Sequence, residues 1–169
     1  FLNGFPNPDG KFRFRPKWFE IGKAHANMPT FPDHQDVIDN ATQDRPFRLV
    51  AAPARRFLNT SFTETPSSVK KEGRPTVLMH PDACQKLGIK DGDRVTLGNE
   101  LGEVTLHARP FDGVLEDVVI VEGIWPNRYF ENGIGINALI SADRAYPNGG
   151  AVFHDTAIWV RPAGGGGKA

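Results

Sequence analysis

Residues 80–95 read His80-Pro81-Asp82-Ala83-Cys84-Gln85-Lys86-Leu87-Gly88-Ile89-Lys90-Asp91-Gly92-Asp93-Arg94-Val95, and no other segment is as informative about the fold. A proline in the first turn, an acid beside it and Gly88 at the end predict a compact helix over residues 80–88. Residues 90–93 are typical of a turn, and they lead directly into a strand that begins at Arg94.

Apolar runs on both sides of this stretch predict further strands. Residues 103–109 alternate, with Val104, Leu106 and Ala108 on one face, as a half-buried strand does. Residues 118–121 are continuously apolar, which indicates a strand buried on both faces. The predicted strands are residues 47–52, 76–79, 94–97, 103–109, 118–121 and 157–160.

Two polar stretches between these strands predict loops. Residues 59–71 are rich in Thr and Ser, include Pro66 and show no apolar period, so we expect a loop there. Residues 123–150 are rich in Gly and Asn, and a loop of this length in a compact domain is usually functional or disordered. Its aromatic residues and the run Ile136 to Ile140 favour function over disorder.

The composition limits the classes of protein to which the chain can belong. Its 169 residues are enough for one domain with a core, and 18 Gly and 14 Pro favour many turns and few long helices. Twenty basic and twenty acidic residues give no net charge, which argues against nucleic-acid binding. The single cysteine, Cys84, allows neither an intrachain disulfide nor a cysteine-based zinc site, and the five histidines show no metal-ligand spacing.

The two ends of the chain differ from its middle. Residues 1–44 form an irregular extension, with a turn at residues 5–10 and a short alternating strand expected at residues 11–15. Residues 45–161 form the domain, and residues 162–169 read as a flexible Gly-rich tail. Both ends indicate a piece of a longer protein. No membrane span or signal peptide is visible, so we expect a cytoplasmic location.

Three stretches together resemble a known family. Residues 55–62 (RRFLNTSF) are similar to its strand-end loop, residues 80–104 to its helix, turn and hairpin, and residues 135–140 (GINALI) to its Asn-x-Leu-Thr segment. The family is the molybdopterin dinucleotide-binding domain that ends the dimethyl-sulfoxide-reductase and formate-dehydrogenase oxidoreductases of molybdenum or tungsten. Ile140 departs from the pattern, because the family often has Thr there.

The resemblance implies a fold and a role. The fold is a six-stranded double-psi β-barrel over residues 45–161. The role is to hold the bis-guanine-dinucleotide pterin cofactor of Mo or W within a formate dehydrogenase-like enzyme, so the partners are the upstream domains and the guanine nucleotide. The metal ligand would lie upstream, so we expect neither a catalytic nor a metal-binding residue here and no activity of the isolated chain.

The chemistry of the dinucleotide selects the candidate contacts. Its pyrophosphate needs a cation and uncharged donors, and its guanine needs groups that can bond to both sides of a base edge. Trp125 is a candidate wall of the pocket, and Asp143 a candidate acceptor from the guanine. The expected cofactor-binding residues are Arg55, Arg56, Asn59, Thr60, Ser61, Trp125, Asn137 and Asp143.

Simpler interpretations remain open beside these. Arg55 and Arg56 are also typical of a solvated pair, Asn137 of a turn former and Trp125 of a core residue. Cys84, four residues after His80, invites a nucleophile–base pair, but a cysteine inside a short packed helix is usually a small apolar residue. The alternative function is a stand-alone double-psi barrel that recognises a protein partner or substrate, as in the N-terminal parts of hexameric ATPases.

Overall fold

The computed structural model describes residues 2–26, 28, 30–31, 39–142, 144–145 and 150–164. The chain divides into two compact units. The smaller unit combines Phe1–Val37 with Arg144–Ala151, and the larger combines Ile38–Asp143 with Val152–Ala169.

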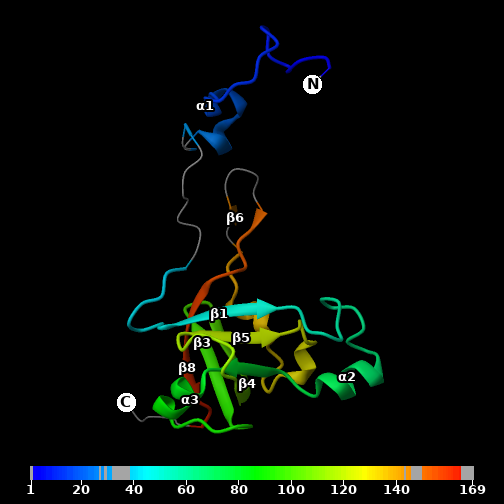
Figure 1. Ribbon diagram of the computed structural model, residues 1–169, viewed down its shortest axis with the longest axis vertical. Helices are drawn as coiled ribbons and strands as arrows, with labels where there is room; N and C mark the ends of the chain where they lie inside the picture. The colour runs from blue at the N-terminus through cyan, green and yellow to red at the C-terminus, as the bar shows by residue number, and fades with distance from the viewer. Residues whose placement is uncertain are drawn as a thin grey trace. The chain divides into compact units, whose positions relative to one another are not determined.

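The larger unit is built on a closed barrel of six strands (Figure 1). Around the barrel the order is β1 (Phe47–Ala52), β5 (Val118–Glu122), β2 (Thr76–Met79), β4 (Gly102–Pro110), β3 (Arg94–Asn99) and β8 (Thr156–Pro162). The pairs β1–β5 and β2–β4 are parallel, and the other neighbours are antiparallel. The predicted mainly β fold with six strands and short helices is therefore confirmed, while the double-psi connection of the strands stays a prediction.

Alternation along the strands fills the barrel with aliphatic side chains. Val104, Leu106 and Ala108 of β4 are at most 2% exposed, as the sequence predicted. In β5 only Val119 and Val121 are fully buried, so the expectation of a strand buried on both faces was wrong. Each large aliphatic side chain buried in this way contributes about 1.5–3 kcal/mol.

The predicted helix at residues 80–88 is present as α3 (Pro81–Leu87). The backbone N–H of Asp82 donates to Nδ1 of His80 at 3.2 Å, and Gly88 ends the helix in the left-handed conformation with φ +68°. Cys84 is buried in this helix, and burial raises the pKa of its thiol. The buried, protonated thiol fits the expectation of a small apolar residue rather than a nucleophile.

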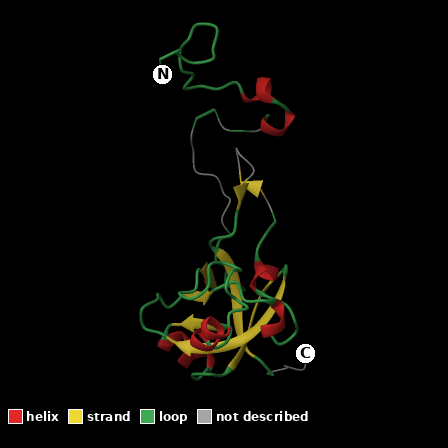
Figure 2. Cartoon of the chain, turned by 90° about the vertical axis from the view of Figure 1, so that its right-hand side faces the viewer, coloured by secondary structure: helices red, strands yellow, loops and turns green. Residues whose placement is uncertain are grey.

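The loop predicted at residues 59–71 is partly wrong, because Pro66–Glu72 form α2. Pro66 occupies the first turn, where its missing N–H costs nothing, and the N–H of Val69 donates to the carbonyl of Thr65 at 3.0 Å. The helix shows no apolar period because a single side chain, Val69, packs against the core. In Figure 2 this and the other short helices of the larger unit lie outside the strands of the barrel.

The long loop predicted at residues 123–150 also contains short regular elements. These are the 3-10 helices η2 (Asn127–Tyr129) and η3 (Ile136–Leu139), and the strand β6 (Arg144–Ala145), which pairs with β7 (Gly150–Ala151). Apolar residues at 136 and 139 anchor η3 in the core, which explains why this segment is ordered.

The smaller unit has little regular structure. The turn at residues 5–10 is confirmed, since the N–H of Phe5 donates to the carbonyl of Gly10 at 3.1 Å. The strand expected at residues 11–15 is wrong: these residues are exposed and pair with no strand in the described part of the chain. The ring of Phe12 instead contacts those of Phe5 and Phe14. Its helices are α1 (Trp18–Ile21) and η1 (Lys23–His25).

Substitution of Gly98 tests how tightly Trp159 packs on the outer wall of the barrel. A Cβ atom at this position would lie 2.1 Å from Cζ2 of Trp159, so Gly98→Ala should destabilise the chain by about 1–3 kcal/mol. Urea unfolding measures the loss. In a Trp159→Ala background the same substitution should cost little, and an equal cost in both backgrounds would contradict this contact.

Candidate nucleotide site at the carboxyl ends of two parallel strands

Two loops leave the barrel at the same end. β1 and β5 are parallel and in register from Arg48↔Val118 to Ala52↔Glu122, so their carboxyl ends are neighbours. The N–H of Gly123 donates to the carbonyl of Ala52 at 2.8 Å and continues this pairing. Figure 1 shows both arrows pointing to the side on which residues 53–65 and 123–140 begin. In open α/β sheets ligands bind beside the carboxyl ends of parallel strands, and by analogy these two loops are the candidate site here.

The first loop ends in a tight turn. Leu58 and Ser61 exchange both backbone hydrogen bonds, at 3.1 and 2.8 Å, which leaves Asn59 and Thr60 at the tip. Asn59 has a φ of +52°, a conformation that asparagine tolerates better than most residues. The buried hydroxyl of Thr63 donates to the carbonyl of Thr60 at 2.9 Å, so the tip has one defined conformation.

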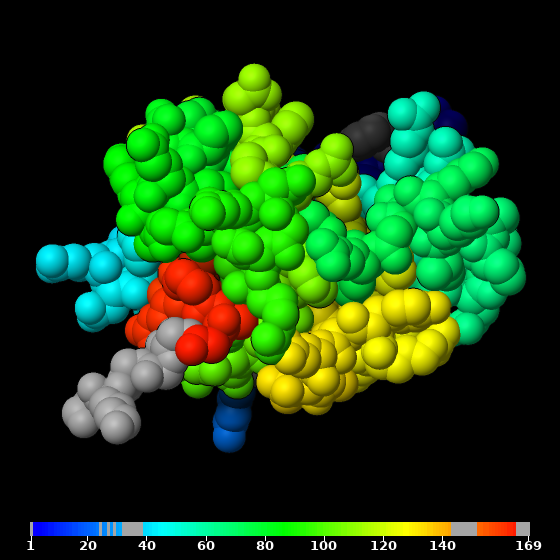
Figure 3. Space-filling model, turned by 90° about the horizontal axis from the view of Figure 1, so that it is seen from below, coloured from blue at the N-terminus to red at the C-terminus, as the bar shows by residue number. Residues whose placement is uncertain are grey.

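Aromatic packing and an ion pair fix this loop to the second one. Phe57 is 5% exposed and meets the edge of Trp125, with ring centroids 4.7 Å apart, and Trp125 in turn contacts Tyr129. Arg128 donates to both carboxylate oxygens of Glu64 at 2.6 Å. In the view of Figure 3, the yellow segment that contains Arg128 borders the blue-green segment that contains α2. The two loops therefore form one surface.

The structure brings five of the expected contact residues together on the first loop. Arg55, Arg56, Asn59, Thr60 and Ser61 are exposed, and their side chains have no hydrogen bond or ion pair with any described residue. Their donors are therefore free to bind a ligand without breaking an internal contact.

The other three expected residues differ in their placement. Asn137 is exposed on η3, on the second loop, and no hydrogen bond joins its side chain to residues 55–61 within the described ranges. Trp125 is 4% exposed and packs edge-on against Phe57. Asp143 lies outside the residues that the structure describes.

Sequence reasoning missed the residues that hold the loop. Thr63 and Glu64 directly follow the stretch that it selected, but nothing in the sequence relates Glu64 to Arg128, which is 64 positions away. The carbonyl of Leu139 accepts from Nδ2 of Asn99 at 2.8 Å, so Asn99 has the same supporting role for η3. The packing of Phe57 could have been predicted, because an aromatic residue inside a polar loop usually packs against other apolar side chains.

The described residues of the larger unit also line two cavities, one of which borders the second loop. One, of about 470 Å³, lies between the outer wall of β4 and the η2 segment, and the other, of about 420 Å³, lies beside α3. None of the expected contact residues lines either cavity. The first is lined by Pro75, Arg94, Thr105, Leu106, His107, Arg128, Tyr129, Phe130 and Glu131. In it Nε of Arg94 donates to Glu131 at 3.0 Å.

The described residues offer neither a metal site nor a membrane span. Among the residues that the structure describes, no three His, Cys, Asp or Glu side chains are grouped so that they could hold a metal ion. Nor does any described helix combine the length and apolar character needed to cross a membrane.

Comparison with known proteins identifies the family. Residues 47–157 match the sequence model of the molydopterin dinucleotide binding domain, which is most of the barrel and both loops. The chain belongs to this family. The matched region includes the 53–65 loop and η3, so the surface described above is part of a domain defined by dinucleotide binding.

Individual relatives are much longer than this chain. It is 29% identical over 160 residues to the probable oxidoreductase YoaE of Bacillus subtilis, covering 95% of this chain and 22% of that protein. It is 24% identical over 125 residues to a respiratory nitrate reductase alpha subunit of Haloferax mediterranei, and the match covers 73% of this chain and 12% of that subunit. It is 27% identical over 131 residues to a trimethylamine-N-oxide reductase of Haemophilus influenzae, and the match covers 73% of this chain and 16% of that enzyme. The chain thus spans less than a quarter of these relatives.

A solved structure supports the fold. The acetylene hydratase of Pelobacter acetylenicus superposes with a TM-score of 0.71 and 16% sequence identity, covering 95% of this chain and 24% of that one. At this level of identity the likeness concerns the fold alone.

Thr63→Val tests whether the buried hydroxyl holds the loop tip. The change keeps the shape but removes the donor to the Thr60 carbonyl, so it should cost about 1 kcal/mol of stability. Amide hydrogen exchange should become faster at Ser61, whose N–H closes the turn. Thr60→Val, an exposed change of the same kind, is the control; unchanged exchange at Ser61 in Thr63→Val would contradict the role.

His107 should make stability depend on pH. Burial, then Arg74 and Arg94, lower its pKa below the usual 6.5, so the unfolded chain takes up the proton first as the pH falls. The stability that neutral, buried His107 contributes to the folded chain is fully present above about pH 6.5. It is lost as the pH falls through the pKa that His107 has in the folded chain. The melting temperature of His107→Gln should therefore fall less between pH 7 and 5 than that of the parent chain. Equal slopes would contradict the lowered pKa.

Proposed function

We propose that the surface formed by residues 53–65 and 123–140 holds the guanine-nucleotide half of molybdopterin guanine dinucleotide. The observation that supports it most is a row of side-chain donors on the first loop that no described residue pairs with. The backbone of this loop is held by hydrogen bonds, and the chain belongs to a family named for dinucleotide binding. A preorganised loop with free donors binds without first ordering itself, which favours affinity.

The donor set fits a pyrophosphate. Arg55 and Arg56 supply two cations that no carboxylate of the described residues neutralises, and hydrogen bonds from arginine to phosphate are charge-assisted and strong. Asn59, Thr60 and Ser61 add side-chain donors beside them without further charge. Exposure of all five means that their contribution is the binding and orientation of an anion at the edge of the barrel.

For the guanine we propose amide recognition. The side chain of Asn137 carries both a donor and an acceptor, so it can bind a base edge, and η3 is held by the buried Ile136 and Leu139. Asp143 as an acceptor from the base and Trp125 as a direct contact stay predictions. The structure gives Trp125 a second role, because its buried indole supports Phe57 at the base of the first loop.

The whole protein, we propose, is a molybdenum or tungsten oxidoreductase that carries a bis-guanine-dinucleotide cofactor. The names of the relatives, a nitrate reductase and a trimethylamine-N-oxide reductase, support this class. When bound, the metal–pterin group supplies the electron transfer to or from the substrate. The metal ligand in upstream domains, the inactivity of this chain alone, the formate dehydrogenase-like subtype and the cytoplasmic location all remain predictions.

Titration of the isotope-labelled chain with GDP tests the proposed site. Weak, saturable amide shifts should cluster at residues 55–61 and around Asn137, and CDP and ADP should bind less tightly because they present different base edges. The double variant Arg55→Gln, Arg56→Gln should bind GDP at least about tenfold more weakly.

The matched control is Lys70→Gln, Lys71→Gln, which removes the same charge from exposed positions of α2 and should leave the affinity unchanged. Equal and scattered shifts with all three nucleotides would contradict the proposal and favour a barrel that recognises a protein partner.

A further inference from the structure

The cavity beside α3 lies at the opposite end of β1 and β5 from the nucleotide loops. Phe47, the first residue of β1, and Asp117, which directly precedes β5, both line it. Six residues of strand separate this end of β1 from the loop, which at about 3.3 Å per residue is roughly 16 Å or more. A ligand here would therefore not share the residues proposed for the dinucleotide.

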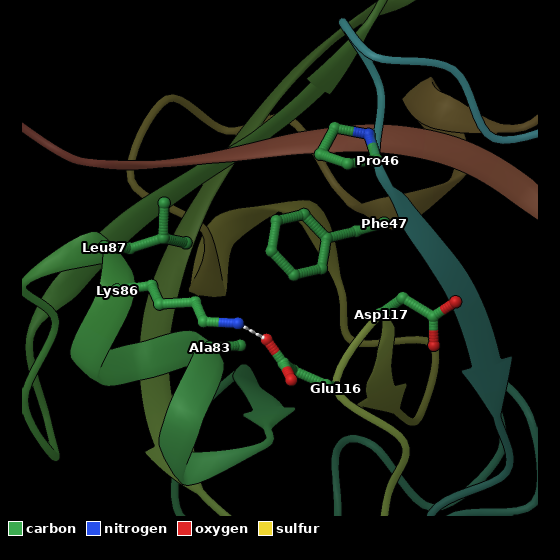
Figure 4. A pocket seen from close by; sticks show the side chains of 7 residues that line it. All are labelled: Pro46, Phe47, Ala83, Lys86, Leu87, Glu116 and Asp117. Carbon is green, nitrogen blue, oxygen red and sulfur yellow. Dashed lines mark hydrogen bonds and ion pairs between the residues drawn. The ribbon is translucent and has the colours of Figure 1, made fainter.

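The interior of this cavity is apolar. Figure 4 shows the ring of Phe47 facing α3, with Ala83 and Leu87 on the helix side and Pro46 above the ring. Phe47 is 9% exposed and Ala83 only 3%, so these side chains are held by the core and do not have to move to present the surface. The volume of about 420 Å³ lies within the range of small-molecule sites.

The mouth of the cavity carries charge. Nζ of Lys86 forms an ion pair with Oε1 of Glu116 across it, as the dashed line in Figure 4 marks. Each partner stabilises the charged form of the other, which raises the pKa of Lys86 and lowers that of Glu116. Asp117 is exposed beside them, and its carboxylate has no hydrogen bond or ion pair with any residue that the structure describes.

The balance of charge around the mouth is negative. Asp82 acts electrostatically on Lys86, and His80 on Glu116, so these are the further titratable groups near the pair. Apart from His80, one positive charge from Lys86 stands against three negative ones from Glu116, Asp117 and Asp82, a sum of −2. The face of the Phe47 ring adds a region that attracts cations.

We propose that this cavity binds a small organic cation, an ammonium group carried on an aromatic or branched apolar body. The body fills the space against Phe47, Ala83 and Leu87, and the ammonium pairs with the free carboxylate of Asp117. Because the dinucleotide is an anion, the two ends of the β1–β5 pair select ligands of opposite charge. The proposal does not depend on the nucleotide site.

Three probes of one shape test the charge preference. The isotope-labelled 169-residue chain is titrated at pH 7 and constant ionic strength with benzylamine, benzyl alcohol and benzoate. Benzylamine should give saturable shifts at the amides of Phe47, Ala83, Leu87 and Asp117. It should bind about fivefold more tightly than the alcohol, with benzoate weakest.

Two substitutions should change the affinity for benzylamine in opposite directions. Asp117→Asn removes the free carboxylate and should reduce the affinity to that of the alcohol. Lys86→Gln releases Glu116 from its ion pair and should tighten binding about two- to threefold. Both positions are exposed, so the variants should fold. Glu131→Gln breaks an ion pair of the same kind at the other cavity and should have no effect.

Several results would overturn the proposal. These are equal affinity for the three probes, shifts that fall outside the residues lining the cavity, or an Asp117→Asn variant that binds benzylamine as well as the parent chain does. Equal affinity in particular would identify an apolar surface without selectivity for charge.

Discussion

The parallel backbone hydrogen bonds between β1 and β5 determine where the loops and the α3 cavity of the larger unit lie. In a closed barrel the two strands cannot slip, because each is also paired on its other side, β1 with β8 and β5 with β2. Their common direction sends both following loops to one end and gathers both preceding turns at the other. One pairing therefore places the surface proposed for the nucleotide at one end of the barrel and a separate cavity at the other.

At the loop end, the residues that offer donors and the residues that hold the backbone are different. Arg55, Arg56 and Asn59 are exposed and unpaired among the described residues, whereas Phe57 and Thr63 are buried and engaged with the core or the backbone. Exposed donors cost nothing in the folded state because water satisfies them, while the buried groups give the loop one conformation. The polar loop of residues 53–65 therefore keeps a fixed backbone while its donors stay exposed.

The sequence predicted those parts of the structure that local pattern controls. Alternation in residues 103–109 and the proline, acid and glycine of residues 80–88 were enough to find β4 and α3. The same logic failed at residues 11–15, where alternation exists but no described strand pairs with it, and at α2, whose single apolar contact leaves no period. Whether one face of a segment is buried depends on the elements that pack against it, and a local sequence pattern does not identify these elements.

The site shows the same limit. The donor loop was recognisable because its residues are consecutive, but the ion pair of Glu64 with Arg128 joins positions far apart and follows only from the strand pairing. The expected contact of Trp125 with the cofactor stays a prediction, and the structure adds that its ring packs against Phe57. The residues that hold the loop in place therefore become visible only in the fold.

Photocrosslinking with 8-azido-GDP, followed by mass spectrometry of the labelled peptides, locates the guanine on the barrel. Ultraviolet light attaches the probe to whatever lies beside the bound guanine. We expect label in residues 53–65 or 135–140, suppressed by unlabelled GDP and not by CDP. Label concentrated at the other end of the strands, around residues 45–47, 83–87 and 116–117, would contradict it.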